Sequence, residues 1–306
     1  MIAYFILVHR FPEQFKRMFR AIYDPANHYV VHVDRNSGQE ISEDIARFLT
    51  PYQNAEMLAG QRARWGGYSL VDAELRGMAR LLEMDPAWTH YINLSGQDFP
   101  LRSQAFIRAY LADSRGKEFI RVLDQALVRP DTMHRVRHIC IEALGRIFRT
   151  GITRRFLRGA RPYIGTQWKI VSRAFCEYAC NAPEAARFKR FYRNSFIADE
   201  GFFQTLMMNG APHGEIVPDD LRMIDWVPDG AIKLRPRTYR SADASELSLS
   251  PCLFARKFDA TEDSAILDLL EHRLAASRAM PPGHNAGPSG PILAPSGRFG
   301  GVAAVA

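Results

Sequence analysis

The stretch Met1-Ile-Ala-Tyr-Phe-Ile-Leu-Val-His9-Arg10 opens the pattern on which the fold of this chain depends. Its apolar part, from Tyr4 to Val8, is rich in residues that favour strands. The run is too short to cross a bilayer, which takes about 20 residues, and it lacks the flanks of a signal peptide. We therefore expect a buried strand here, with His9 and Arg10 at its carboxyl end.

Strand and helix patterns alternate through most of the remaining sequence. Further strands are predicted at 29–33, 90–94, 118–122 and 167–171, and helices at 11–22, 42–49, 69–83, 103–111, 173–181, 184–191 and 199–208. Such alternation indicates an α/β fold with a mainly parallel central sheet flanked by helices. The last stretch, 277–306, has no core pattern, and we expect it to form a disordered Gly/Pro/Ala-rich tail.

Composition narrows the class of protein. The 306 residues are 47% hydrophobic and 24% charged, which excludes a mostly disordered chain. Forty Lys+Arg against 33 Asp+Glu give a net charge of +7. This excess favours contact with nucleic acid, an acidic lipid surface or a phosphorylated small molecule, and composition does not choose among them. The four cysteines lack the paired spacing of a zinc site, which favours reduced thiols in a cytoplasmic protein.

Residues 129–162 differ from their surroundings because arginine is crowded there. We expect an excursion from the sheet that is mainly helical. Its arginines either form a solvated basic face or contact an anion or the acceptor of a transferred group.

Polar residues follow the predicted strands at the places where a ligand would bind. His9 and Arg10 follow the first strand, Asp34 and Arg35 the second, and Asp98 the third. Ligands of an open α/β sheet lie at the carboxyl ends of its strands, so these residues are expected to converge. For Asp98 the alternative is a carboxylate that only caps the turn after its strand.

Several common motifs are absent from the sequence. It has no G-x-G-x-x-G and no P-loop, which argues against a dinucleotide fold and a P-loop nucleotide site. It also has no Asp-x-Asp, no H-E-x-x-H and no compact histidine cluster, so it predicts no metal site. Asp199 and Glu200 begin a predicted helix, where a favourable interaction with the helix dipole would also explain them.

Seven stretches, taken in order, resemble the core-2/I-branching enzyme family, glycosyltransferase family 14, which includes the peptide O-xylosyltransferases. They are Tyr-Phe-Ile-Leu-Val-His9, Val-His-Val-Asp34-Arg-Asn-Ser37, Trp65-Gly-Gly-Tyr-Ser69, Tyr-Ile-Asn-Leu-Ser-Gly-Gln-Asp98-Phe-Pro100, Gly165-Thr-Gln-Trp168, Ala-Asp-Glu200-Gly-Phe-Phe and Leu-Phe-Ala-Arg-Lys257-Phe-Asp259. The resemblance implies a GT-A-like fold in one catalytic domain over 1–276. Its UDP-sugar half would span about 1–122 and its acceptor half about 123–276.

The resemblance also implies an activity. It is an inverting transfer of N-acetylglucosamine or xylose from a UDP-sugar to a hydroxyl of a glycan or peptide, with no divalent metal and no other cofactor. The alternative is an inactive nucleotide-sugar or carbohydrate-binding protein of the same fold. Nucleic acid is not an expected partner, because residues 129–162 carry no known reader motif.

Site residues follow from the resemblance position by position. Glu200 matches the catalytic base, and Lys257 matches the lysine that holds the diphosphate. Arg237 matches the arginine partner of that lysine, with Arg235 as the alternative. His9 and Asp34 fall on the UDP-sugar side, and Asp34 falls at the uridine end. Three further residues line the site or meet the acceptor: Asp98, Trp168 and Trp226.

The chain departs from the animal members of the family in two ways. Those enzymes carry an N-terminal membrane anchor and several disulfides, whereas this sequence starts at its first predicted strand and lacks that cysteine set. The departures favour a bacterial-type, cytoplasmic enzyme, with peripheral contact to the inner membrane as an additional possibility. The sequence leaves the donor sugar, the acceptor and the oligomeric state open.

Overall fold

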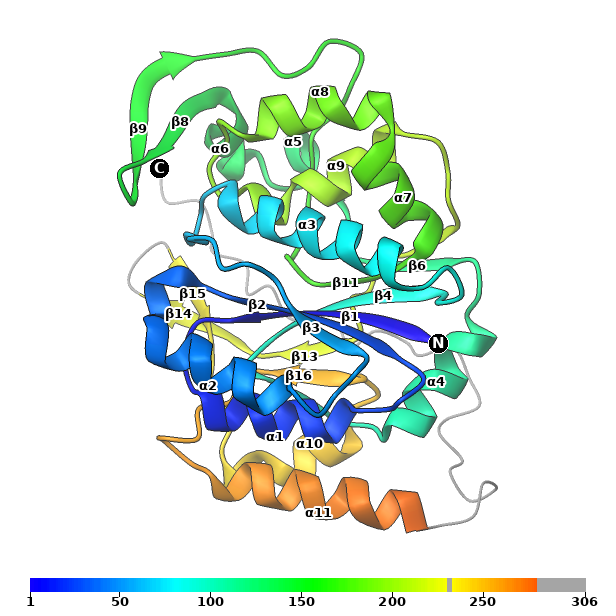
Figure 1. Cartoon of the computed structure of the whole chain (residues 1–306). Helices are drawn as coiled ribbons and strands as arrows, with labels where there is room; N and C mark the ends of the chain where they lie inside the picture. Colours follow the sequence, from blue (N-terminus) through cyan, green and yellow to red (C-terminus); the bar gives the residue numbers. More distant parts are fainter. Residues whose placement is uncertain (230–232, 280–306) are drawn as a thin grey trace.

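The computed structural model describes residues 1–229 and 233–279, and a seven-stranded sheet runs through its centre (Figure 1). In spatial order the strands are β12 (Glu215–Val217), β6 (Lys117–Ile120), β11 (Lys169–Ser172), β4 (His90–Ser95), β1 (Ile2–Val8), β2 (His28–Val33) and β3 (Ala55–Met57). β1 pairs in parallel with β2 and β4, as β2 does with β3 and β12 with β6. The expected mainly parallel sheet is therefore confirmed.

One strand breaks the parallel order. β11 runs antiparallel to both of its neighbours, β4 and β6. Its sequence predicted a strand but could not predict its direction, because a buried strand shows the same apolar run in either orientation. The direction places Trp168, just before β11, next to the carboxyl ends of the parallel strands.

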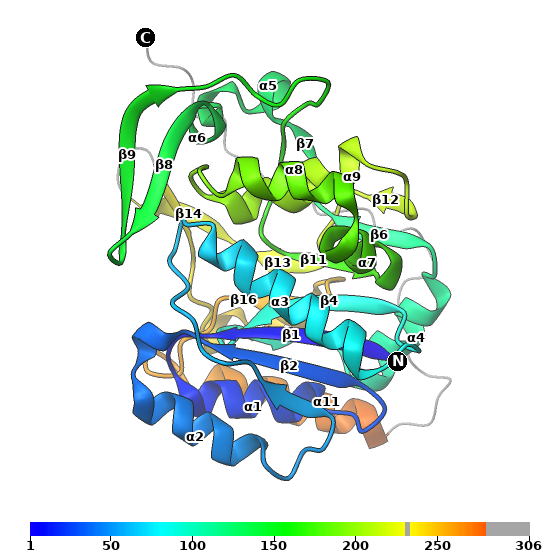
Figure 2. The ribbon, with the colours of Figure 1, turned by 45° about the horizontal axis from the view of Figure 1, so that its top comes forward.

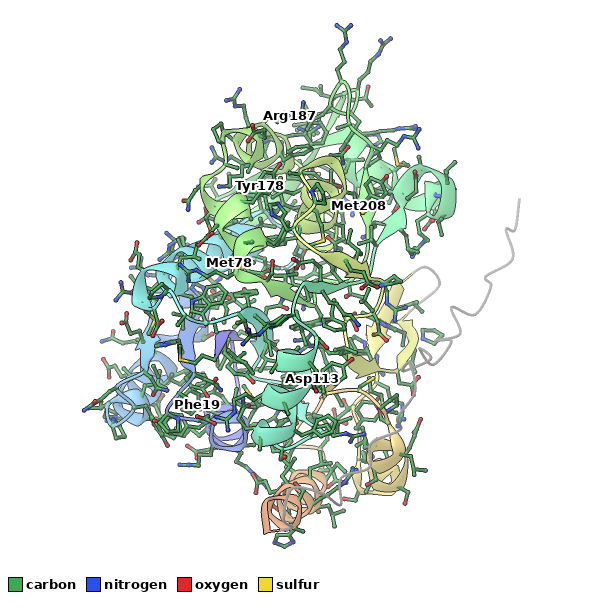
Figure 3. All side chains as sticks on the ribbon, turned by 90° about the vertical axis from the view of Figure 1, so that its right-hand side faces the viewer. Phe19, Met78, Asp113, Tyr178, Arg187 and Met208 are labelled. Atoms are coloured by element: carbon green, nitrogen blue, oxygen red, sulfur yellow. The ribbon has the colours of Figure 1, made fainter. Side chains whose placement is uncertain are left out.

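Helices cover both faces of the sheet (Figures 1 and 2). One face carries α1 (Pro12–Ile22), α2 (Gln39–Leu49), α4 (Gln104–Asp113), α10 (Ala244–Leu249) and α11 (Ala265–Ala279). The other carries α3 (Ser69–Met84), α7 (Arg173–Asn181), α8 (Pro183–Tyr192) and α9 (Phe202–Asn209). Side chains alternate between the two faces of a strand, so β1 contributes side chains to two separate apolar cores. Phe19 of α1 lies in one core and Met78 of α3 in the other, as their positions in Figure 3 show.

A second, three-stranded sheet joins distant parts of the chain. It consists of β13 (Arg222–Ile224), β16 (Phe254–Arg256) and β5 (Asp98–Pro100), and β16 pairs antiparallel with β5. β14 (Trp226–Asp229) and β15 (Lys233–Pro236) form a hairpin beside it. The pairing sets Arg256 opposite Asp98, so the last part of the chain reaches the edge where β1 and β4 end.

The arginine-rich region is not mainly helical, and this expectation was wrong. Its helical parts are short: the 3-10 turn η2 (Pro130–Thr132) and α6 (His134–Arg137), with α5 (Gln125–Val128) just before the region. Its largest element is a β-hairpin made of β8 (His138–Ala143) and β9 (Arg146–Thr153), which projects from the body of the molecule (Figure 2). β7 (Leu123–Asp124) and β10 (Tyr163–Ile164) pair at its base. The apolar residues of the hairpin do not alternate regularly with polar ones, since Ile139, Cys140 and Ile141 are consecutive, as are Ile147 and Phe148.

Smaller differences concern the ends of elements. The helix expected at 199–208 is split at Gly201 into the 3-10 turn η3 (Ala198–Glu200) and α9. Two more 3-10 turns are η1 (Arg35–Ser37) and η4 (Ser241–Asp243). α11 continues to Ala279, past the expected start of the tail at 277, and the rest of that tail lies outside the described residues. All four cysteines are free. No helix in the described part of the chain has the length and apolarity needed to span a membrane.

Candidate functional site

Three segments meet at the carboxyl edge of the central sheet. His9 and Arg10 follow β1, the turn from Ser95 to Asp98 follows β4, and Arg256 ends β16. The Arg10 guanidinium donates to the Gln97 side chain at 3.1 Å. Arg256 donates to the Asp98 carboxylate at 2.8 Å and to the Ser95 hydroxyl. The expected convergence of strand ends is therefore present, with Arg256 added to it.

Lys257 lies next to this meeting point with more cations than carboxylates around it. Partial burial and the neighbouring charges of Arg10, Arg256 and Arg235 lower the pKa of Lys257, and the charge of Glu262 acts in the other direction. Among the described residues, Lys257 forms no ion pair. We call Arg10, Arg235, Arg256 and Lys257 the cationic cluster. An excess of positive charge that the protein does not neutralise is a suitable binding site for an anion.

Arg237, the first choice as partner of Lys257, is already occupied. Its guanidinium binds Asp225 at 2.7 Å and Asp243 at 2.9 Å. Arg235, two residues earlier in β15, is exposed and close enough to influence Lys257. The structure therefore favours Arg235, the alternative that the sequence left open.

His9 and Asp34 lie beside each other at the ends of β1 and β2. Part of the His9 side chain is exposed. The pKa of His9 is lowered to about 4, because its ring is partly desolvated and because Arg10 and Arg256 carry positive charge nearby. The imidazole is therefore neutral at pH 7. Asp34 caps η1 by accepting from the backbone N–H of Asn36 at 2.9 Å, and it also accepts from the N–H of Ala63 at 3.2 Å.

A cavity of about 790 Å³ opens beside Asp34. The loop before α3 contributes Trp65 to its wall, and the β8–β9 hairpin contributes Arg146 and Arg149. The remaining lining residues are Asn36, Ala63, Arg64, Ile147 and Phe196. The arginine-rich hairpin, whose role the sequence did not decide, therefore forms part of the wall of the site.

Glu200 lies at the end of η3, on the other side of the sheet edge. Its Oε2 accepts from the Arg135 guanidinium at 2.6 Å, and about a third of its side chain is exposed, at 31%. Its Oε1 accepts no hydrogen bond from the described residues. The adjacent Asp199 is buried, and its desolvation together with the Glu200 charge raises the pKa of Asp199 to about 7.

Trp168 lies between the cationic cluster and the carboxylates of η3. It is only 2% exposed, and the guanidinium groups of Arg222 and Arg256 lie over its ring, each 4.8 Å from the ring centre. The next residue, Lys169, forms a buried ion pair with Glu74 at 2.8 Å, and its charge also acts on Asp199. Contacts thus run from the cationic cluster through Arg256 to Trp168, and the charge of the next residue, Lys169, reaches Asp199 of η3.

Asp98 and Trp226 occupy contrasting environments. Asp98 is fully buried, accepts from the Ser95 N–H at 2.9 Å and pairs with Arg256. It therefore holds the turn and the arginine in place, which fits the capping role considered from the sequence, while contact of Asp98 with an acceptor stays a prediction. Trp226 begins β14 and is 37% exposed, so its ring can contact a ligand.

Sequence reasoning missed three residues of this site. Arg256 stood beside Lys257 in a quoted stretch but had no role assigned, and the signal was its position between a buried apolar run and Lys257. Arg135 was one of many arginines without a distinguishing pattern. Asp199 was interpreted together with Glu200 as a helix start. The sequence does not show that Asp199 is buried whereas Glu200 is partly exposed. The described residues contain no group of three His, Cys, Asp or Glu side chains that could hold a metal ion.

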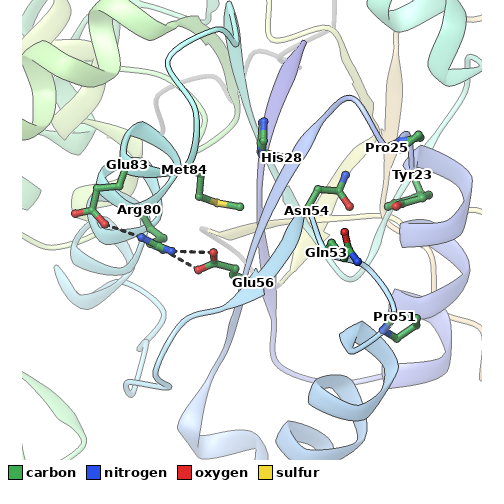
Figure 4. Close-up of a pocket in the computed structure, with 10 residues that line it drawn as sticks. All are labelled: Tyr23, Pro25, His28, Pro51, Gln53, Asn54, Glu56, Arg80, Glu83 and Met84. Atoms are coloured by element: carbon green, nitrogen blue, oxygen red, sulfur yellow. Dashed lines mark hydrogen bonds and ion pairs between the residues drawn. The ribbon is translucent and has the colours of Figure 1, made fainter.

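Another cavity, of about 570 Å³, lies at the opposite end of β2, near His28 (Figure 4). Arg80 bridges Glu56 and Glu83 in its wall, so the cation there is neutralised. This contrast identifies the carboxyl edge, with its unneutralised charge, as the candidate functional site.

Comparison with known proteins bears on the family of this chain. A model of the core-2/I-branching enzyme family matches residues 2–251. Human xylosyltransferase 2 is 28% identical over 303 residues, which cover 92% of this chain and 34% of that protein. Rat xylosyltransferase 1 is 28% identical over 291 residues, which cover 89% of this chain and 35% of that protein. The crystal structure of mouse xyloside xylosyltransferase 1 in its apo form matches with a TM-score of 0.33 and 11% identity, over 68% of this chain and 82% of that one.

The chain spans about a third of the length of the xylosyltransferases that it matches. The family model, by contrast, covers most of the chain. On that match, the chain belongs to the core-2/I-branching enzyme family.

Proposed function

We propose that this chain is an inverting glycosyltransferase. It would move a sugar, N-acetylglucosamine or xylose, from a UDP-sugar to a hydroxyl of a glycan or peptide without a divalent metal. The observation that carries the proposal is the cationic cluster at the carboxyl edge of the sheet. Family membership and the names of the xylosyltransferase relatives support the same reaction class.

The cluster suits the diphosphate of the donor. Three cations of the cluster, Lys257, Arg235 and Arg10, have no carboxylate partner in the described residues, and the Arg10 guanidinium donates to the Gln97 side chain. Cations fixed in place before the reaction stabilise the charge that develops on the leaving diphosphate, because they need no reorganisation. This is the role that a metal ion serves in other enzymes.

Asp34 and His9 would hold the nucleoside part. Asp34 lies at the wall of the 790 Å³ cavity, with Oδ1 committed to η1 and the adjoining loop. The neutral His9 ring can both donate and accept a hydrogen bond. Their position next to the cationic cluster matches the short distance between a uridine and its diphosphate.

Glu200 would act as the base. Its Oε1 takes the proton from the acceptor hydroxyl while that oxygen forms a bond to the anomeric carbon. The bond from this carbon to the diphosphate oxygen breaks, and UDP leaves with the electron pair. Arg135 holds Oε2 and so fixes the direction of the carboxylate. Positioned general bases contribute about 10²–10⁴-fold to a rate.

Two substitutions test the proposal. Glu200→Gln should lower transfer by about 10²–10⁴-fold while calorimetric binding of UDP stays unchanged. Lys257→Ala should weaken UDP binding by roughly tenfold or more, since a hydrogen bond to a charged group contributes about 1.5–3 kcal/mol. Lys117→Ala, at the amino end of β6, is the matched control and should change neither quantity.

The assay should compare UDP-N-acetylglucosamine, UDP-xylose, UDP-galactose and UDP-glucose as donors, with and without EDTA. Near-normal turnover of Glu200→Gln would remove Glu200 from the role of base. Activity that EDTA abolishes and Mn²⁺ restores would contradict a metal-independent reaction. UDP binding without transfer from any donor would support the inactive binding protein instead.

A further inference from the structure

The outer face of the β8–β9 hairpin is apolar and uncovered. Ile141 and Phe148 are directly opposed across the hairpin, and each is 45% exposed. Leu144 at the tip is 94% exposed and Ile152 is 61% exposed. Figures 1 and 2 show that the hairpin projects beyond the helices, so the described part of the chain does not cover this face.

The inner face fixes the hairpin to the body of the protein. Glu142 accepts from the backbone N–H of Ser69 at 3.0 Å and from its hydroxyl at 2.5 Å. Ile147 packs near Gly66. The inner-face residues Glu142 and Ile147 thus provide contacts that attach the hairpin.

The turn of the hairpin presents a leucine at a position that does not favour one. Leu144 and Gly145 are the two central residues, with φ of 49° and 71°. Such a turn favours Asn-Gly, because a branched side chain is strained at positive φ. Leu144 is therefore locally strained, and it is a large apolar side chain at the exposed tip of the hairpin.

Positive charge surrounds the apolar face. Arg146 of the hairpin and Arg137 just before it are exposed, and the exposed Arg155 and Arg158 follow it. Arg149 is also exposed, but it belongs to the inner face, where its guanidinium lies 4.3 Å from the ring centre of Phe196. Glu142 is the only acidic residue in 138–153, and it is directed inward. The exposed surface of the hairpin thus combines apolar side chains with cations and carries no carboxylate.

We propose that the β8–β9 hairpin docks on an anionic lipid surface. Leu144, Phe148 and their apolar neighbours would enter the boundary between headgroups and acyl chains, and the arginines would contact the anionic headgroups. A second copy of the chain is a poorer occupant, because it would bring the same positive charge against this surface. A convex hairpin tip also fits a lipid layer better than a peptide groove.

Docking would orient the candidate site. Arg146, Ile147 and Arg149 of the same hairpin line the cavity beside Asp34. The cavity would be held close to the lipid surface, where an acceptor attached to a membrane could reach it.

Vesicle sedimentation tests the proposal with the full chain. The protein should sediment with vesicles that contain phosphatidylglycerol and remain in solution with phosphatidylcholine alone, and added salt should weaken the binding. Leu144→Asp should reduce binding by about tenfold or more. Leu249→Asp is the matched control, because Leu249 is 85% exposed on α10, and it should bind as the unchanged protein does.

Leu144→Asn separates docking from folding. Asparagine suits the turn better, so the melting temperature should stay the same or rise while vesicle binding falls. Unchanged vesicle binding in Leu144→Asp would overturn the proposal. So would a dimer in solution that Leu144→Asp converts to a monomer, or binding to RNA with no binding to vesicles.

Discussion

Arg235 and Arg237 lie two positions apart, yet their surroundings give them different roles. The Arg237 guanidinium joins Asp225 to Asp243, while Arg235 is exposed beside Lys257. A pattern of residue types cannot distinguish them, because both are arginines in the same short stretch. The carboxylates that occupy Arg237 come from positions that only the fold brings together.

This contrast predicts opposite effects of two substitutions. Arg235→Ala should weaken UDP binding by roughly tenfold and leave the melting temperature unchanged, because only a cation facing the ligand is lost. Arg237→Ala should lower the melting temperature by about 2–4 °C, the effect of about 1 kcal/mol in a chain of this size. Calorimetry with UDP and thermal unfolding distinguish the two. Stronger loss of UDP binding in Arg237→Ala would restore Arg237 as the diphosphate ligand.

At the scale of elements, the packing of α3 on β1 depends on one glycine. A methyl group on Gly77 would overlap the buried ring of Phe5. In an exposed helix, Gly→Ala is stabilising by about 1 kcal/mol, through backbone entropy. At Gly77 the cost of the overlap exceeds this gain in free energy, because the ring of Phe5 is buried in the core and cannot easily move away.

Gly77→Ala should therefore destabilise the protein by about 1–3 kcal/mol, as overpacking in a core does. Gly151→Ala in β9 is the control, because a methyl group there has no neighbour within 4 Å, and its effect should be close to zero. Urea unfolding measures both. If Gly77→Ala were as stable as the unchanged protein, α3 would not be packed this closely on β1.

The elements also show where sequence patterns fail. Long apolar runs and amphipathic stretches predicted β1, β2, β4 and the main helices, with bounds close to those observed. The β8–β9 hairpin was missed because its turn is Leu-Gly rather than Asn-Gly, and because arginine is common in helices. Its strand character depends on the fit of Glu142 and Ile147 against residues 66–69, which are distant in sequence.

At the scale of the whole molecule, buried histidines link folding to pH. His90 is 1% exposed, and burial lowers its pKa to about 4. His32 is also buried, and its pKa is lowered for the same reason. Between pH 4 and 6.5 the unfolded chain binds a proton at His90 and the native protein does not. The contribution of His90 to stability is therefore complete above about pH 6.5 and decreases as the pH falls toward 4, and His32 acts in the same direction.

For His90 the loss can reach about 3 kcal/mol at the acid end of this window. His90→Gln should make the free energy of unfolding less dependent on pH between 7 and 5. His272→Gln on α11 is the control, because this histidine is exposed, and it should leave the slope unchanged. If the free energy of unfolding depended on pH equally in His90→Gln and in the unchanged protein, His90 would not be a source of the pH dependence.

The sequence by itself determined the α/β class, the order of most elements and the family resemblance that the family match confirms. It could do so because burial imposes a local period on every strand and helix, and because short motifs are continuous in the chain. Only the tertiary structure decided the direction of β11, the β8–β9 hairpin and the pairing of Arg237 with Asp225 and Asp243, which leaves Arg235 beside Lys257 without such partners. These features depend on strand pairing, close packing and ion pairs, which no local pattern encodes.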